Sequence, residues 1–263
     1  MNNDYYTLIT GASRGIGKAI AAEMASRGHN LILHSLPGEH LENFSSHLME
    51  NHGVRIRYFE IDLTDHDGPS RLFNSIKAED LNINILVNNA GIGIEGPAES
   101  CSNKDIDYIL SLNIRALTLL TTLFIPDLKK TKSYILNISS LGTFIPTPYK
   151  TVYLASKTYI FYFTRALEAE LKGSSVKTCI FAPGGVRTNK KVLERIERAG
   201  WISKSSSISP EEVARHGIKA MFKGKKVVIP GRLSSLIFNL GLFVPEGIIL
   251  AVTRKLFKRE LSV

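Results

Sequence analysis

Tyr153 and Lys157 lie four residues apart in a stretch that predicts a helix, so their side chains share one face. A tyrosine hydroxyl has a pKa of about 10, which is too high for efficient proton transfer near neutrality. A neighbouring ammonium stabilises the phenolate and therefore eases that transfer. The same spacing also occurs in ordinary helices, as a packed ring beside a solvated amine. The pair therefore indicates acid–base chemistry only when other residues support it.

Ser140 is a third residue with chemical potential. It follows a predicted strand over residues 134–138, and ligands of open α/β sheets bind at the carboxyl ends of the strands. Its hydroxyl could hold a substrate oxygen that gains charge during a reaction. Ser139 stands next to it and could be mistaken for the functional hydroxyl.

A glycine-rich turn follows the first predicted strand, with Gly11, Gly15 and Gly17 in the segment 10–17. Glycines at such a turn allow a sharp bend, a close backbone approach to a pyrophosphate and tight packing of helix on strand. The N-terminus of the following helix offers unpaired N–H groups and a favourable dipole to phosphates. Because the turn opens an alternating chain, it predicts a dinucleotide site.

The preferred nicotinamide dinucleotide is indicated by charges near the second strand. Proteins that bind NAD usually carry an acidic residue there for the ribose hydroxyls, whereas this chain has no carboxylate until Glu39. Arg14 in the glycine turn could meet the 2′-phosphate of NADP with its forked donors. The simpler alternative is a solvated turn residue. We expect NADP(H), with NAD(H) as the alternative.

Short apolar runs alternate with helical stretches along most of the chain. The predicted strands cover residues 6–10, 31–35, 55–61, 85–88, 134–138, 176–181 and 227–229, and the predicted helices run from the glycine turn to Ser26 and over 39–50, 69–78, 104–129 and 149–171. Such alternation predicts parallel pairing with right-handed crossovers. We expect an α/β fold: one doubly wound Rossmann-type domain over residues 1–232, with a mostly parallel sheet of about seven strands.

The bulk composition excludes few functions. The 263 residues are 44% hydrophobic and 22% charged, which is ordinary for a soluble globular protein. The net charge is +9, but the basic residues form no nucleic-acid-binding motif, so we expect no nucleic acid partner. Cys101 and Cys179 have no metal-ligand spacing, and we expect neither a metal site nor a disulfide. With no signal-peptide pattern at the N-terminus, the expected location is the cytoplasm.

Several motifs occur together in one order, and their combination resembles the short-chain dehydrogenase/reductase family over about residues 5–190. The motifs are Thr10-Gly-x-x-x-Gly-Ile-Gly17, Asn88-Asn89-Ala90-Gly91, Asn113, Ser140, Tyr153-x-x-x-Lys157 and Pro183-Gly184. The family serine lies thirteen residues before its tyrosine, a spacing that selects Ser140 over Ser139.

The resemblance implies an oxidoreductase that moves a hydride between a nicotinamide and a carbonyl/alcohol pair. Tyr153 would be the general acid or base, and Lys157 would hold the nicotinamide ribose and assist Tyr153. Ser140 would position the substrate oxygen, and Asn113 would anchor a water-linked proton relay. The cofactor-binding residues implied by the resemblance are Gly11, Ser13, Arg14, Gly15, Ile16, Gly17, Asp62, Leu63, Asn89, Ala90, Gly91, Tyr153, Lys157, Pro183, Gly184, Val186 and Thr188.

The chain departs from the family after the sixth predicted strand. Many members end in an Asp-Gly-Gly segment that supports tetramer packing, whereas this chain has Lys225 to Gly231 and a longer tail. The tetramer is therefore in doubt, and a homodimer through the helices at 104–129 and 149–171 is expected. By resemblance, residues 189–209 would form a substrate lid.

The tail, residues 233–263, admits two interpretations. It is apolar to Val252, interrupted by Asn239, Pro245 and Glu246, and then basic. These polar interruptions disfavour a membrane-spanning helix. The tail would either pack over the mouth of the active site, which we favour, or bind a membrane surface peripherally.

The function expected from the sequence is hydride transfer between NADP(H) and an apolar carbonyl or alcohol. The alternatives are a catalytically silent protein that senses nicotinamide and a peripheral membrane scaffold. Because a pure binder has no need of Ser140, Tyr153 and Lys157 together, their presence favours the enzyme.

Overall fold

The computed structural model describes most of the chain. The described residues are 4–188, 192–194, 207–231, 234–236, 238 and 244–261. The predicted substrate lid, 189–209, falls largely outside them, so that prediction is not examined by the structure.

The described residues contain one seven-stranded sheet in the order β3-β2-β1-β4-β5-β6-β7. Every neighbouring pair in it is parallel. The strands are β1 (Tyr5–Thr10), β2 (Asn30–Ser35), β3 (Ile56–Glu60), β4 (Asn82–Asn88), β5 (Ser133–Ile138), β6 (Val176–Phe181) and β7 (Val227–Val228). The predicted α/β doubly wound fold is confirmed, and the sheet is parallel throughout.

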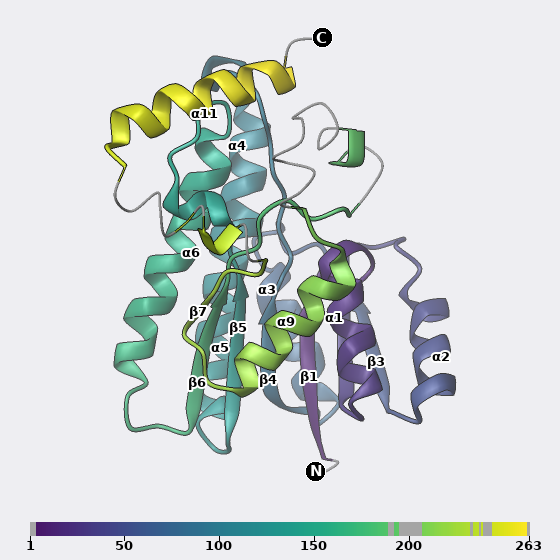
Figure 1. The fold of residues 1–263 in the computed structure, drawn as a ribbon. Coiled ribbons are helices and arrows are strands. Elements are labelled where there is room, and N and C mark those ends of the chain that lie inside the picture. The colour runs from purple at the N-terminus through teal and green to yellow at the C-terminus, as the bar shows by residue number, and fades with distance from the viewer. Residues whose placement is uncertain are drawn as a thin grey trace.

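Helices connect these strands and cover both faces of the sheet (Figure 1). They are α1 (Gly15–Ser26), α2 (Leu41–His52), α3 (Gly68–Ala78), η1 (Ala98–Ser100), α4 (Asn103–Ile109), η2 (Leu110–Ala116), α5 (Leu117–Leu128), η3 (Leu141–Phe144), α6 (Thr151–Glu170), α9 (Pro210–Phe222) and α11 (Glu246–Leu261).

Two hydrophobic clusters hold the layers together. Successive residues of a strand point to opposite faces, so Leu8 and Ile9 of β1 enter different clusters. The first cluster lies under α1, α2 and α9, and the second lies under α3, α5 and the end of α6. Because both faces are covered, the strands carry continuous apolar runs, as parallel sheets require.

The long helix predicted over 104–129 is not uniform. Asn103–Ile109 and Leu117–Leu128 are α-helical, but Leu110–Ala116 forms a π-helix between them. Residues Asn103–Leu128 together are long and apolar enough to cross a membrane by composition. Leu120, Phe124 and Leu128 are nevertheless buried against the sheet, as expected for a core helix.

Helix α9 was not predicted from the sequence, although its signals are present. Ser209 caps it, its Oγ accepts the Glu212 N–H at 3.2 Å, and the Glu212 carboxylate accepts the Ser209 N–H. Val213, Ile218 and Met221 then pack on α1 and the sheet. A capping box followed by helical apolar spacing is sufficient to predict such an element.

The strand order reverses between β1 and β4, because β1 also pairs with β2 while β4 pairs with β5. In open α/β sheets, ligands bind at such a switch point, beyond the carboxyl ends of the strands. The glycine turn follows β1 and Asn89 follows β4, so both motifs meet at this point.

Candidate active site

The glycine turn packs so tightly that larger residues would not fit. Gly11 has a φ of +66°, and a Cβ there would approach the Ala90 Cα to 3.0 Å. A Cβ on Gly17 would lie 2.0 Å from the Gly11 carbonyl oxygen. Gly11 thus requires a left-handed backbone and Gly17 a close approach of helix to turn. Both are the roles that the sequence assigns to a phosphate-binding turn.

Thr10 and Asn89 connect this turn to the end of β4. The Thr10 hydroxyl accepts the N–H groups of Asn89 and Ala90, each at 3.0 Å. The Asn89 amide donates to the carbonyl oxygens of Thr10 and Gly11, at 2.9 and 3.0 Å. The Asn89 side chain therefore joins two loops, and the neighbouring Gly91 is left exposed at the switch point. Thr10 was not predicted as a site residue on its own.

His34 at the end of β2 supports the turn from below. Its Nε2 donates to the Ile61 oxygen at 2.8 Å, which leaves Nδ1 to accept the Gly11 N–H at 3.5 Å. Burial lowers the pKa of His34 to about 4, while the hydrogen bond to Ile61 and the charge of Asp62 oppose the shift. The ring is therefore neutral at pH 7 and bridges the ends of three neighbouring strand segments.

Lys157 lies deep in the molecule at the carboxyl edge of β5. Only 4% of it is exposed, and its Nζ donates to the Ile138 oxygen at 3.0 Å. Desolvation lowers the pKa of Lys157 to about 8. A buried lysine with one carbonyl partner is rare in a helix unless it serves a function. The solvated amine considered from the sequence is therefore excluded.

Tyr153 lies one helical turn before Lys157 on α6. The Lys157 Nζ is 5.9 Å from the centroid of the Tyr153 ring. A Cβ on Gly93 would lie 3.5 Å from that ring, so the loop after β4 packs against it. The two residues predicted to act together are thus neighbours at the edge where the glycine turn lies.

The two adjacent serines have different surroundings. Ser139 is buried, and its hydroxyl donates to the Lys157 oxygen at 3.0 Å and pairs with the Thr143 hydroxyl at 2.8 Å. Ser140 is half-buried, caps η3, and accepts the Gly142 N–H at 3.2 Å. A hydroxyl rotor with one such contact can still donate to a ligand. The geometry therefore agrees with the choice of Ser140 as the substrate-facing serine.

Asn113 is fully buried in the π-helical segment. Its Oδ1 accepts the Ile92 N–H and its Nδ2 donates to the Ile92 oxygen, both at 2.9 Å. Nδ2 also donates to the Ser156 hydroxyl at 2.9 Å. A Cβ on Gly91 would lie 3.1 Å from Asn113 Oδ1 and 3.2 Å from Lys157 Nζ. The Asn113 amide and the Lys157 ammonium are therefore close to each other. The amide anchors the loop after β4, and its part in a water relay stays a prediction.

A buried polar network behind the site was missed in the sequence. The Asn88 amide donates to the Asn137 Oδ1 at 2.8 Å and to the Thr121 hydroxyl at 2.9 Å. Asn137 in turn donates to the Thr164 hydroxyl at 2.8 Å. These bonds join β4 and β5 to the helices α5 and α6, and so hold the helix of Tyr153 on the sheet. The signal was an asparagine within each of two apolar strands.

The remaining predicted cofactor residues differ in what they can offer. Leu63 and Val186 are buried in the hydrophobic clusters, so only their backbone groups are available to a ligand. The Asp62 carboxylate accepts the Thr64 N–H at 2.8 Å and its hydroxyl at 2.7 Å. Arg14 is exposed, and its guanidinium lies 3.4 Å from the Glu39 carboxylate.

Ser13, Ile16, Gly184 and Thr188 are half-buried, while Pro183 is buried. A Cβ on Gly15 would lie 3.2 Å from the Thr188 side chain, so the segment after β6 reaches the glycine turn. Gly15 in the glycine turn and Thr188 after β6 are therefore neighbours at the carboxyl edge of the sheet.

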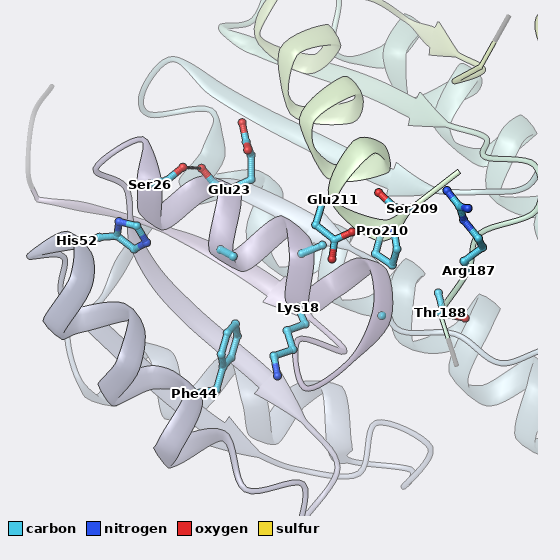
Figure 2. A pocket seen from close by; sticks show the side chains of 13 residues that line it. Lys18, Glu23, Ser26, Phe44, His52, Arg187, Thr188, Ser209, Pro210 and Glu211 are labelled. Carbon is cyan, nitrogen blue, oxygen red and sulfur yellow. Dashed lines mark hydrogen bonds between the residues drawn. The ribbon is translucent and has the colours of Figure 1, made fainter. Parts of the chain in front are cut away.

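A pocket of about 720 Å³ lies on the outer side of α1 (Figure 2). Its wall includes Lys18, Phe44, Arg187 and Thr188, and the Lys18 Nζ lies 4.9 Å from the centroid of the Phe44 ring. Gly15 and Thr188 of the predicted cofactor site also line this pocket, but Ser140, Tyr153 and Lys157 do not. We therefore assign the chemistry to the carboxyl edge of the sheet.

This edge fits a dinucleotide. No side chain of the described residues caps the start of α1, and its first turn carries no carboxylate. Its free N–H groups and dipole therefore suit a pyrophosphate. Without Cβ atoms at Gly11 and Gly17, the backbone can approach that group closely.

Comparison with known proteins agrees with this geometry. The short chain dehydrogenase family model matches residues 6–198. The very-long-chain 3-oxoacyl-CoA reductase of Anas platyrhynchos is 36% identical over 197 residues, which cover 72% of this chain and 62% of the duck protein. Hydroxysteroid dehydrogenase-like protein 1 of Gallus gallus is 32% identical over 252 residues, which cover 92% of this chain and 73% of the chicken protein.

The solved structure of a short-chain dehydrogenase from Sphingobium yanoikuyae in complex with NADPH is also similar. It shares 26% identity with a TM-score of 0.79, over 93% of this chain and 95% of that chain. The matched part of this chain spans less than two thirds of the duck protein's length. The chain belongs to the short-chain dehydrogenase family, whose members are NAD(P)-dependent oxidoreductases acting on carbonyl and alcohol groups.

Proposed function

We propose that this chain is an NADP(H)-preferring oxidoreductase for apolar carbonyl and alcohol substrates. One observation carries the proposal: the buried Lys157 ammonium lies beside the Tyr153 ring at the edge where the glycine turn is. A buried cation next to a phenol is expensive to maintain in a protein that does no proton transfer. The silent sensor and the scaffold are therefore less favoured.

In the proposed reaction, the nicotinamide supplies the hydride in reduction and accepts it in oxidation. Tyr153 donates its hydroxyl proton to the carbonyl oxygen in reduction and takes a proton from the alcohol in oxidation. Ser140 donates a hydrogen bond to the same oxygen, which stabilises the charge that develops there. Lys157 stabilises the phenolate that remains on Tyr153. Asn113 holds the loop after β4 in place.

The preference for NADP(H) is supported by Arg14. Its exposed guanidinium has Glu39 as its partner at 3.4 Å, and an exposed pair of this kind is weak. A 2′-phosphate would offer more charge and bidentate acceptors in exchange. The end of β2 carries the buried, neutral His34 and no carboxylate, whereas NAD-binding proteins usually have an acidic residue near there for the ribose.

The substrate class follows from the relatives and the surroundings of the site. The duck relative is named for reducing very-long-chain 3-oxoacyl-CoA, and Phe144, Phe161 and Phe238 form edge-to-face pairs beside Ser140 and α6. We infer an apolar carbonyl substrate, with 3-oxoacyl thioesters as the first compounds to test.

Partners and location complete the proposal. Tyr162 and Tyr159 of α6 and Leu110 of the π-helix expose 68%, 37% and 42% of their surface, which suits a homodimer through these helices. Because both cysteines are free thiols, we propose a reducing, cytoplasmic setting.

The proposal is tested with a panel of carbonyl compounds, from small ketones to 3-oxoacyl thioesters, monitored by NADPH and NADH absorbance. We expect oxidation of NADPH with at least one apolar carbonyl, faster than with NADH. Binding of NADPH without turnover of any panel member, in either direction, would support the silent sensor instead.

A further inference from the structure

Exposed large apolar side chains gather in the C-terminal part of the chain. Six of them define what we call the docking face: Leu236 (52% exposed), Val244 (38%), Ile248 (55%), Leu250 (37%), Val252 (53%) and Leu256 (38%). Elsewhere among the described residues, exposed Leu110, Tyr159 and Tyr162 belong to the proposed dimer surface, and others such as Met49 and Tyr58 are scattered singly. Three residues of the docking face, Ile248, Val252 and Leu256, recur every four residues along α11 and form a contiguous stripe, which indicates an interaction site.

Thr253 and Phe257, on one face of α11, contact the rest of the domain. The Thr253 hydroxyl lies 3.3 Å from the Pro146 oxygen and 2.8 Å from the Ile249 oxygen of its own helix, and the Lys150 Nζ lies 4.0 Å from the centroid of the Phe257 ring. Residues four apart share a helix face, so Ile248, Val252 and Leu256 form a stripe adjacent to the Thr253–Phe257 face. The stripe is rotated by about 100° from the face that contacts the domain, and its side chains are exposed.

The charged residues of α11 are mainly basic, with four lysines and arginines against Glu246 and Glu260. Arg254 and Lys255 are exposed, and Lys258 and Arg259 follow within the same helix, whereas Glu246 lies at its far end. Cationic residues beside an exposed apolar stripe are the composition of helices that lie in a membrane interface. With 16 residues, α11 is shorter than the roughly 20 that a spanning helix needs.

We infer that the docking face binds the surface of an anionic lipid bilayer, with α11 lying in the interface plane. A second copy of the chain is a poorer occupant. In a two-fold contact the same patch meets itself, so the basic residues of both α11 helices would be brought together. Phosphate headgroups instead neutralise these residues while the apolar stripe enters the acyl boundary.

The position of the docking face relative to the candidate active site suggests what bilayer contact would do. Helix α11 lies beyond the end of the sheet toward which the strands run (Figure 1). Its contacts, Pro146 and Lys150, belong to the loop between Ser140 and Tyr153. Bilayer contact would therefore place the mouth of the site next to the membrane, where apolar carbonyl compounds dissolve. This role rests on the proposed function, whereas the bilayer contact does not.

The test is flotation of the full-length protein with vesicles of phosphatidylcholine alone or with phosphatidylglycerol added. We expect flotation with the anionic vesicles at low salt and release at high salt, because salt screens the attraction. The double variant Ile248→Glu/Val252→Glu should reduce the floated fraction at least tenfold. The variant Arg254→Gln/Lys255→Gln should reduce it several-fold and flatten the salt dependence.

A matched control carries the same change at exposed apolar residues elsewhere, Met49→Glu/Tyr58→Glu, and should float as the parent protein does. Melting temperatures identify any variant that fails to fold. If the Ile248→Glu/Val252→Glu variant does not fold, the flotation of the Arg254→Gln/Lys255→Gln variant tests the inference instead. Turnover of a small soluble ketone should be equal in all folded variants. If no ketone is turned over but the protein floats, the proposed oxidoreductase function fails and the bilayer contact stands.

Two outcomes would overturn the inference. One is a parent protein that stays with the soluble fraction at low salt in the presence of anionic vesicles. The other is a Ile248→Glu/Val252→Glu variant that floats normally but changes from dimer to monomer in light scattering. The second outcome would make the docking face an interface between copies of this chain.

Discussion

The edge of the sheet that carries the glycine turn, called the nucleotide edge, and helix α11 are held by different interactions. At the nucleotide edge, Thr10, Asn89 and Asn113 each make several hydrogen bonds in buried or half-buried positions. In α11, Thr253 is the buried side chain among the described ones, and it makes one hydrogen bond to the domain. Closed polar networks tolerate little change, whereas a helix held by few contacts keeps surface free for an outside partner.

Removal of the Tyr153 hydroxyl should have the largest effect on function. General acid–base catalysis contributes about 10²–10⁴-fold, so Tyr153→Phe should lower kcat by that order and leave NADPH binding unchanged. Stopped-flow turnover and fluorescence titration measure the two. The control is Tyr162→Phe, an exposed tyrosine of the same helix. Near-native turnover of Tyr153→Phe would contradict the proposed proton transfer.

A pair of glycine substitutions contrasts the two regions directly. In Gly17→Ala the new Cβ would meet the Gly11 oxygen at 2.0 Å, so the turn must move. We expect a loss of about 3 kcal/mol in the free energy of unfolding and loss of NADPH binding. In Gly247→Ala no described atom lies within 4 Å of the new Cβ, and alanine favours a helix by up to about 1 kcal/mol. Urea unfolding measures both, and equal effects would remove the contrast.

The buried His34 should make stability depend on pH. Its folded pKa of about 4 is below the unfolded value of 6.5, so the unfolded state binds more protons between these limits. The neutral ring therefore contributes its full stability above pH 6.5, and this contribution falls as the pH decreases toward 4. Urea unfolding across pH 4–8 should show the slope, and His34→Asn should flatten it. An unchanged slope in the variant would assign the effect to other groups.

Arg14 should affect the preference for NADPH over NADH more than it affects the binding of both cofactors. Charge-assisted hydrogen bonds contribute about 1.5–3 kcal/mol, so Arg14→Ala should weaken NADPH about tenfold or more and leave NADH nearly unchanged. Glu39→Gln, which frees the guanidinium from its present partner, should not weaken NADPH. Titration of both cofactors decides, and an equal loss for both would make Arg14 a turn residue only.

The smallest effect is expected at the contact that holds α11. Phe257→Leu keeps an apolar side chain but removes the ring beneath the Lys150 ammonium. A cation–π contact of this kind contributes about 0.5–1 kcal/mol, so the melting temperature should fall by only a few degrees. A large loss of stability would show that α11 is part of the domain core and would end the contrast with the nucleotide edge.

The helices and strands that were predicted correctly are those with strong local signals. Residues 176–181 form a short, mostly apolar run between two helical stretches, and the predicted bounds equal those of β6. The predicted helix 39–50 begins later, at Leu41, because His40 adopts a left-handed conformation and the Glu60 carboxylate accepts the Leu41 N–H at 3.2 Å. The start of α2 therefore depends on Glu60, a residue of β3, and the spacing of residues near Leu41 does not reveal this contact.

The sequence by itself predicted the alternation of strands and helices, without α9, and the glycine turn, whereas the group Ser140, Tyr153 and Lys157 was implied by the resemblance to a family. The alternation and the turn depend on periodicity and on short spacings within the chain. Only the tertiary structure decided the burial of Lys157, the pairing of Arg14 with Glu39 and the face that α11 turns outward. Each of these depends on side chains brought together by the fold, whose desolvation and charge no local pattern encodes.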